Sequence, residues 1–271
     1  MAPVVTFLSD FGSADPFVGI CHAVILRICP EAVVVHLGHG IKPQAVAQGA
    51  RALASAVPYA PVGVHLAVVD PDVGSQRRAV VLRSGDGRLF VGPDNGLLLP
   101  AAEACGGVEL AVHVTERSFM LEHISRTFHG RDVFAPVAGY LAGGVDPAEL
   151  GAALDGAQLA RCRMPGFVRA GALVTAEVAQ VDRFGNVQLS CSRADVDELF
   201  SAGGSVELRT EEDRYLAVSV QTFADVRPGE LVLFGDSDGW LSIAINRGDA
   251  GSLLDVSIGD RLDLDFEPAA A

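Results

Sequence analysis

The chain of 271 residues is 49% hydrophobic, which is enough apolar material for one large buried core or two smaller ones. A formal net charge of -14 without a basic cluster argues against a nucleic-acid-binding protein. No apolar run reaches the roughly 20 residues of a membrane span, and the start of the chain lacks the basic segment of a signal peptide. We therefore expect a cytoplasmic protein without membrane partners.

The first half of the chain alternates apolar segments typical of strands with segments of helical periodicity. Val4–Ser9, Val33–Leu37 and Val62–Val69 are predicted strands, and Phe17–Ile28 and Gln44–Val57 are predicted helices between them. Near-continuous apolar strands that alternate with helices indicate an α/β fold, in which helices flank a largely parallel sheet.

The next elements complete this first domain. Two predicted strands, Arg78–Arg83 and Arg88–Val91, are joined by Ser-Gly-Asp-Gly, which is a hairpin signal. A helix over Leu97–Cys105, a strand over Leu110–Val114 and a helix over Val133–Leu141 follow. We place the α/β domain at residues 1–145.

The pattern changes after about residue 143. Residues 146–170 are rich in Gly, Ala and Pro, and we predict a linker there. Only Arg193–Phe200 has a helical pattern in the remainder, so residues 171–271 are predicted to form a smaller, all-β, barrel-like domain. The predicted strands of this domain are Leu173–Val181, Val187–Leu189, Val206–Leu208, Tyr215–Val220, Leu231–Phe234, Leu241–Ile245 and Arg261–Phe266.

Two aspartates follow predicted strands of the parallel sheet. Asp10 comes after the first strand and Asp70 after the third. Ligands of such sheets bind beyond the carboxyl ends of the strands. A carboxylate at this edge can accept hydrogen bonds from two vicinal hydroxyls, such as those of a ribose, although Ser-Asp-Phe-Gly taken alone predicts only a turn.

Charged side chains continue after Asp70. Asp72, Arg77 and Arg78 stand in the same loop, where they could form an ion pair over a pocket or a solvated cluster of charges. His129 precedes a predicted helix, whose free backbone N–H groups favour anionic species. The other six histidines are predicted to be structural.

Two further strings of polar residues are ambiguous. Pro-Asp-Asn-Gly at 93–96 predicts a turn. Asp-Arg-Phe-Gly-Asn at 182–186 is also turn-like, but Asp182 could hold an ammonium group, Phe184 could stack on a ring, and Asn186 could hydrogen-bond a base.

Several classes of site are excluded. The chain contains none of the short motifs of dinucleotide-binding, phosphate-binding, zinc-protease or serine-hydrolase sites. Its five cysteines include no C-x-x-C pair, and no paired His or Asp spacing supports a metal. We expect neither a disulfide framework nor a metal site.

Taken together and in order, the polar segments resemble the S-adenosyl-L-methionine hydrolase (adenosine-forming) family, relatives of the adenosyl fluorinase and chlorinase. The matching segments are T-F-L-S-D-F-G at 6–12, V-V-D-P-D-V-G at 68–74, G-P-D-N-G at 92–96, T-F-H-G-R-D-V-F-A-P at 127–136, D-R-F-G-N at 182–186 and L-S-I-A-I-N at 241–246. The family pattern has Gly where this chain has Asp72, a difference that concerns the local shape of the loop.

The resemblance implies roles for particular residues. Asp70, Arg77 and His129 would handle the water nucleophile, and S-adenosyl-L-methionine would be the substrate, with no cofactor. The implied substrate-binding residues are Asp10 for the ribose, Asp182 and Ser237 for the methionine ammonium, and Phe184, Asn186 and Asn246 for the adenine. The family also implies a homotrimer, with each site at a subunit interface.

Three functions remain open at this point. In the first, water attacks C5′ of S-adenosyl-L-methionine in line with the C–S bond. In the second, a halide attacks instead, but the halogenating relatives carry an aromatic residue at the position of Asp70. In the third, the protein is a non-catalytic module that binds adenosine or S-adenosylmethionine, and the intact set of Asp70, Arg77 and His129 argues against it.

Overall fold

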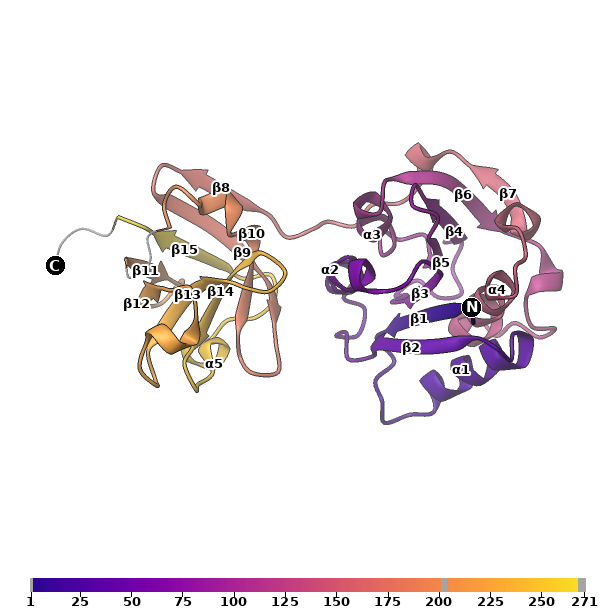
Figure 1. Cartoon of the computed structure of the whole chain (residues 1–271), viewed down its shortest axis with the longest axis horizontal. Helices are drawn as coiled ribbons and strands as arrows, with labels where there is room; N and C mark the ends of the chain where they lie inside the picture. The colour runs from indigo at the N-terminus through magenta and orange to yellow at the C-terminus, as the bar shows by residue number, and fades with distance from the viewer. Residues whose placement is uncertain (1, 201–203, 268–271) are drawn as a thin grey trace. The chain divides into compact units, whose positions relative to one another are not determined.

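The computed structural model describes residues 2–200 and 204–267. The chain divides between Arg163 and Met164 into two compact units, which Figure 1 shows in purple to rose and in rose to yellow. The first unit is an α/β domain and the second contains a closed β-barrel, so the predicted fold class is confirmed.

A seven-stranded sheet forms the centre of the first unit, in the order β2-β1-β3-β5-β4-β6-β7. The first four strands of that order pair in parallel and the others are antiparallel, so about half of the sheet has the expected parallel character. Its strands are β1 (Val4–Ser9), β2 (Val33–Gly38), β3 (Val64–Val68), β4 (Ala79–Ser84), β5 (Leu89–Pro93), β6 (Val108–Val114) and β7 (Gly151–Leu154).

Helices cover this sheet, with α1 packed against α4 and α2 against α3 (Figure 1). Along β1, Val5 and Phe7 belong to the core that α1 and α4 share, and the alternate residues Thr6 and Leu8 are also buried. Since alternate side chains of a strand point to opposite faces, both faces of β1 are covered. The four helices are α1 (Phe17–Ile28), α2 (Val46–Ala56), α3 (Leu99–Ala104) and α4 (Ala135–Ala142).

The segment that the sequence assigns to a linker differs in the structure. Residues 147–158 contain two short 3₁₀ turns, Pro147–Leu150 and Gly156–Gln158, with β7 between them. Strand β7 pairs with β6, which its Gly- and Ala-rich sequence did not indicate. A short apolar edge strand of this kind carries too little pattern to be recognised.

The second unit is built from eight strands in the order β10-β14-β13-β12-β11-β15-β9-β8. An additional pairing of β9 with β10 closes seven of them into a barrel, and β8 lies outside it against β9. The strands are β8 (Phe167–Ala170), β9 (Leu173–Val181), β10 (Val187–Ser192), β11 (Ser205–Arg209), β12 (Arg214–Ser219), β13 (Leu231–Gly235), β14 (Trp240–Ile245) and β15 (Arg261–Asp265).

The helical content of the barrel unit differs from the prediction. The segment Arg193–Phe200 forms only a 3₁₀ turn over Ala194–Val196. A short helix, α5 (Ala250–Leu254), was not predicted and begins after Asp249, whose side chain accepts a hydrogen bond from Ser252 N. Among the described residues, none of the helices has the length and apolarity that crossing a membrane requires.

Candidate active site

The carboxyl ends of β1 and β3 bring two of the predicted residues to one edge of the sheet. These strands pair in parallel up to Ser9 and Val68, and the N–H of Asp10 donates to the carbonyl of Val68 at 3.3 Å. Asp10 and Asp70 therefore follow neighbouring strands at the edge where ligands of parallel sheets bind.

At this edge, Asp70, Arg77 and His129 form one connected set. Arg77 Nε donates to both carboxylate oxygens of Asp70, at 2.9 and 3.0 Å, and Nη2 donates to Asp70 as well. Nη2 also lies 2.8 Å from Nδ1 of His129. The side chains of Arg77 and Asp70 are only 8% and 5% exposed, so their charge-assisted hydrogen bonds are shielded from water.

The contact with Arg77 determines how His129 is protonated. A guanidinium group is always a donor, so Nδ1 of His129 must be the acceptor and the neutral ring carries its proton on Nε2. Burial, followed by the positive charge of Arg77, lowers the pKa of His129, although Asp70 and Asp132 act in the opposite direction. His129 is therefore neutral at physiological pH.

One end of Arg77 remains available. Its guanidinium lies over the ring of Phe134, 5.0 Å from the centroid, and Phe134 is fully buried. With Nε and Nη2 committed to Asp70 and His129, Nη1 has no hydrogen-bond partner among residues 2–200 and 204–267. The free N–H groups of Nη1 can donate to a water molecule or an anion.

The loop between Asp70 and Arg77 is held by close backbone contacts. Gly74 has a φ of +80°, and a Cβ atom there would lie 2.2 Å from the carbonyl oxygen of Arg126. Only glycine fits this conformation and this space. The loop therefore packs directly on the segment that leads to His129.

The neighbouring charges of this loop do not join the set. Asp72 is exposed, and Arg78 pairs with Asp94 instead. In the predicted turn at 93–96, Asn95 Nδ2 donates to the carbonyl of Val69 at 2.8 Å. Through this contact the turn supports the end of β3 beside Asp70.

Asp10 has surroundings that the sequence did not reveal. Its Oδ2 accepts a hydrogen bond from Gln44 N at 3.0 Å. The preceding Ser9 begins a chain of hydrogen bonds in which Ser9 Oγ lies 2.7 Å from His39, His39 lies 2.8 Å from His36, and His36 lies 3.1 Å from His22. This chain of contacts joins the residue before Asp10 to His36 on β2 and to His22 on α1.

In the barrel unit, three of the predicted ligand residues line one cavity of about 410 Å³, namely Asp182, Asn186 and Ser237. Asp182 Oδ1 accepts from the backbone N–H of Phe184 and Asn186, and its Oδ2 accepts from Asn186 Nδ2 at 2.8 Å. The Asp-to-Asn turn is thus ordered by Asp182, which leaves the amide oxygen of Asn186 for other partners.

Other residues of this cavity were not recognised from the sequence. Phe223 and Phe234 pack edge to face, with ring centroids 4.9 Å apart, and both line the cavity. Asp236 lies beside them and accepts hydrogen bonds from Gln188 and Ser242 at 2.7 and 2.9 Å. Because Phe223 stands in a three-residue 3₁₀ turn, no periodic pattern marks it.

Two predicted ligand residues do not line the cavity. Phe184 is 68% exposed, and Arg183 lies over its ring at 5.4 Å. Asn246 Nδ2 donates to the carbonyls of Phe223 and Val226, at 3.1 and 2.9 Å. Asn246 therefore supports the segment that carries Phe223.

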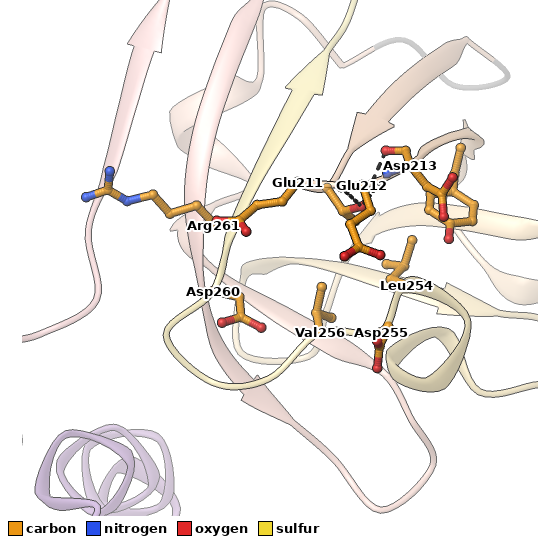
Figure 2. A pocket seen from close by; sticks show the side chains of 10 residues that line it. Glu211, Glu212, Asp213, Leu254, Asp255, Val256, Asp260 and Arg261 are labelled. Atoms are coloured by element: carbon orange, nitrogen blue, oxygen red, sulfur yellow. Dashed lines mark hydrogen bonds between the residues drawn. The ribbon is translucent and has the colours of Figure 1, made fainter.

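A second concavity of the barrel unit, about 210 Å³ in volume, contains none of the predicted residues. Figure 2 shows the carboxylates around it, which include Glu211, Glu212 and Asp260. A row of exposed carboxylates alone specifies no ligand. Across the part of the chain that the structure describes, no group of three or more His, Cys, Asp or Glu side chains is arranged to hold a metal ion.

Comparisons with known proteins cover both units. Residues 5–151 match the model of the SAM hydroxide adenosyltransferase N-terminal domain, and residues 176–263 match that of the C-terminal domain. A Salinispora tropica protein named (R)-S-adenosyl-L-methionine hydrolase is 50% identical over 261 residues, which are 96% of this chain and 97% of the relative. A fluorinase of an Actinoplanes species is 28% identical, over 90% of this chain and 91% of the relative.

A solved structure also resembles this chain over nearly its whole length. An uncharacterized conserved protein from Thermotoga maritima superposes on the chain with a TM-score of 0.90. It is 35% identical in sequence, and the match covers 96% of this chain and 99% of that protein. The likeness extends over both units.

Proposed function

Because this chain belongs to the SAM hydroxide adenosyltransferase family, we propose that it hydrolyses S-adenosyl-L-methionine to adenosine and L-methionine. Two findings support this function. The chain is 50% identical, over nearly its whole length, to a protein named as such a hydrolase. Its sheet edge also carries the observation on which the mechanism rests, a guanidinium held on one side by Asp70 and His129 and free on the other.

The reaction is a substitution at carbon. The oxygen of water or hydroxide forms a bond to C5′ of the ribose, and the C5′–S bond breaks with its electron pair going to sulfur. The positively charged sulfonium becomes the neutral thioether of methionine, and the proton of the attacking water passes to solvent. Holding the water in line with the C–S bond removes much of the entropic barrier.

Within this reaction, Arg77 is the residue that hydrogen-bonds the nucleophile. Its free Nη1 donates to the attacking oxygen and stabilises hydroxide character. Asp70 fixes the guanidinium through three hydrogen bonds. His129 accepts from Nη2 through Nδ1, so it orients Arg77 and has no lone pair left for the proton of the water.

The residues proposed to bind the substrate form two sets, one at the sheet edge of the first unit and one on the barrel unit. Asp10 accepts from the ribose hydroxyls at the sheet edge. On the barrel unit, Asp182 and Ser237 hold the methionine ammonium and Asn186 hydrogen-bonds the adenine, which the cavity that they share supports. Phe184 offers an exposed ring for stacking, and Asn246 acts by holding the segment of Phe223.

The proposal includes an assembly and a compartment. The enzyme acts as a cytoplasmic homotrimer without cofactor, in which the first unit of one subunit and the barrel unit of the next hold each substrate. What supports this assembly is that the proposed ligand residues fall into two sets on separate compact units. A ring of three identical subunits needs only one kind of interface, which is repeated between each subunit and the next.

A product assay tests the function. Purified protein is incubated with S-adenosyl-L-methionine in chloride-free buffer and again with added chloride, and the nucleosides are separated by chromatography. We expect adenosine and methionine in equal amounts in both buffers. A halogenated nucleoside that forms only with halide would establish the halogenase instead, and bound substrate without any product would establish a binding module.

A further inference from the structure

Asp132 is a buried carboxylate three residues beyond His129, and the mechanism above gives it no role. It is 0% exposed. Its Oδ2 accepts from the backbone N–H of Ser125 at 2.8 Å, and its Oδ1 accepts from Arg131 Nε at 2.6 Å. Burial opposes ionisation, but the hydrogen bonds from Arg131 and Ser125 outweigh it and lower the pKa of Asp132. The side chain is therefore ionised at neutral pH.

Hydrogen bonds to Asp132 hold residues 121–128, the irregular segment before His129, in place. Its backbone carbonyl accepts from Leu121 N at 2.9 Å, and its own N–H donates to the carbonyl of Phe128 at 3.1 Å. Ser125 in turn accepts from Phe128 N through its hydroxyl at 3.0 Å. Residues 121–128 are thus attached to one buried residue through its side chain and through its backbone.

Phe128, the residue before His129, connects this attachment to the imidazole. Its N–H donates to the hydroxyl of Ser125, and its carbonyl accepts from the N–H of Asp132. Nδ1 of His129 lies 2.8 Å from Nη2 of Arg77, so the ring can accept from Arg77 only while its backbone is held in place. Asp132 and Ser125 together therefore fix the backbone from which the ring of His129 reaches Arg77.

We propose that Asp132 is a positioning residue, which holds the segment from Ser125 to Phe128 so that the imidazole of His129 stays where Nδ1 accepts from Arg77. This inference rests on the proposed function of Asp70, Arg77 and His129. Asp132 does not reach the substrate, and its carboxylate acts only through His129.

The first experiment compares Asp132→Asn with the parent enzyme. The amide keeps the shape of the carboxylate but cannot accept from both Ser125 N–H and Arg131 Nε. We expect kcat to fall by about tenfold to a hundredfold, because small displacements of a catalytic group have effects of this size. The dissociation constant for adenosine should stay within about twofold, because Asp132 makes no proposed substrate contact. Asp146→Asn, the same change at an exposed helix cap of the first unit, should alter neither quantity.

A double-mutant cycle then separates positioning from a general loss of structure. In a His129→Ala background, Asp132→Asn should lower kcat little further, because both changes disable the same clamp. Effects that multiply would overturn the proposal, and so would an unchanged kcat in the single variant. If the parent enzyme itself forms no adenosine, the proposed function fails before this inference is tested.

Nitrogen-15 NMR of the imidazoles needs no variant that must fold. In the parent protein, His129 should show a protonated Nε2 and an unprotonated Nδ1, independent of turnover. Where Asp132→Asn folds, its His129 signals should shift toward a mixture of tautomers. A protonated Nδ1 in the parent protein would contradict the proposal directly.

Discussion

At the scale of single residues, the chemistry depends on the planar fork of Arg77. The same guanidinium contacts Asp70 with two nitrogens and His129 with one of them. Lysine has the same charge but cannot make these contacts together. We expect Arg77→Lys to lower kcat by about a hundredfold, with an adenosine affinity close to that of the parent, as measured by steady-state kinetics and calorimetry.

The adjacent arginine provides the matched control. Arg78 pairs with Asp94 and contributes no contact to Asp70 or His129. Arg78→Lys should therefore leave kcat within about twofold of the parent value, with a stability loss of roughly 1 kcal/mol at most for this partly exposed pair. Equal losses of kcat in both variants would mean that Arg77 has no special place in the reaction.

The sequence could predict these residues only in part. Asp10 and Asp70 were identified from strand ends, but patterning left open whether the charges after Asp70 form an ion pair or a solvated cluster. Both occur, since Asp70 pairs with Arg77 in a buried setting while Asp72 is exposed. The contact to His129 joins residues 52 positions apart, so no local pattern could reveal it. Its place in the set came from the family resemblance, and the domain matches confirm the family.

At the scale of elements, the packing of the Gly74 loop can be tested by comparing a substitution at Gly74 with the same substitution at Gly87. Gly74 and Gly87 have φ values of +80° and +88°, but a Cβ at Gly74 meets Arg126 at 2.2 Å, whereas nothing lies within 4 Å of one at Gly87. Gly87→Ala should cost about 1 kcal/mol, the strain of a left-handed residue. Gly74→Ala should cost about 3 kcal/mol and also lower kcat, since it adds a clash.

Chemical denaturation of the two variants measures this difference. Unfolding free energies that fall equally would show that the packing of the two loops is looser than the contact with Arg126 implies. The activity of Gly87→Ala should equal that of the parent, because its hairpin connects β4 and β5 and bears no proposed site residue.

Element limits were predicted well where the apolar pattern is long. Strand β1 and helix α1 begin and end at the predicted residues. The turn that follows His129 was not predicted: residues Gly130–Phe134 form a π-helical turn before α4 begins. Such a turn requires tertiary support, here the attachment of residues 121–128 to Asp132, and no propensity encodes it.

At the scale of the whole molecule, a buried histidine links folding to pH. His65 is 0% exposed, its Nδ1 contacts Thr6 at 2.8 Å, and its Nε2 has no partner among the described residues. Burial, followed by the charge of Arg88, lowers its pKa to about 4 from the ordinary histidine value of about 6.5. The unfolded chain thus takes up a proton first as the pH falls, so stability decreases from pH 6.5 toward pH 4.

Denaturation at a series of pH values measures this dependence. By pH 4, His65 should account for roughly 2–3 kcal/mol of the lost stability, at about 1.4 kcal/mol for each unit of pKa. His65→Leu should make the loss of stability between pH 6.5 and pH 4 smaller by this amount, while the contribution of His39, whose pKa burial also lowers to about 4, should remain. A parent curve that is flat in this window would contradict the prediction.

The proposed homotrimer predicts complementation between inactive subunits. Asp70→Asn impairs the first unit and Asp182→Asn the barrel unit, so each variant alone should be nearly inactive. If each site takes its two halves from different subunits, an equal mixture that is unfolded and refolded together should recover about a quarter of the parent activity by random assortment. No recovery, with trimers present by light scattering, would place both halves of a site in one subunit.

The closure of the barrel has a consequence for how the chain is made. Strand β15, the last strand among the described residues, lies between β9 and β11, and β9 is the first strand of the barrel. A ribosome therefore delivers the α/β unit complete and able to fold, but the barrel cannot close until residue 265 has emerged. Until then two strand edges are open to other chains, so a message that ends before Arg261 should yield an aggregating product rather than a shortened enzyme.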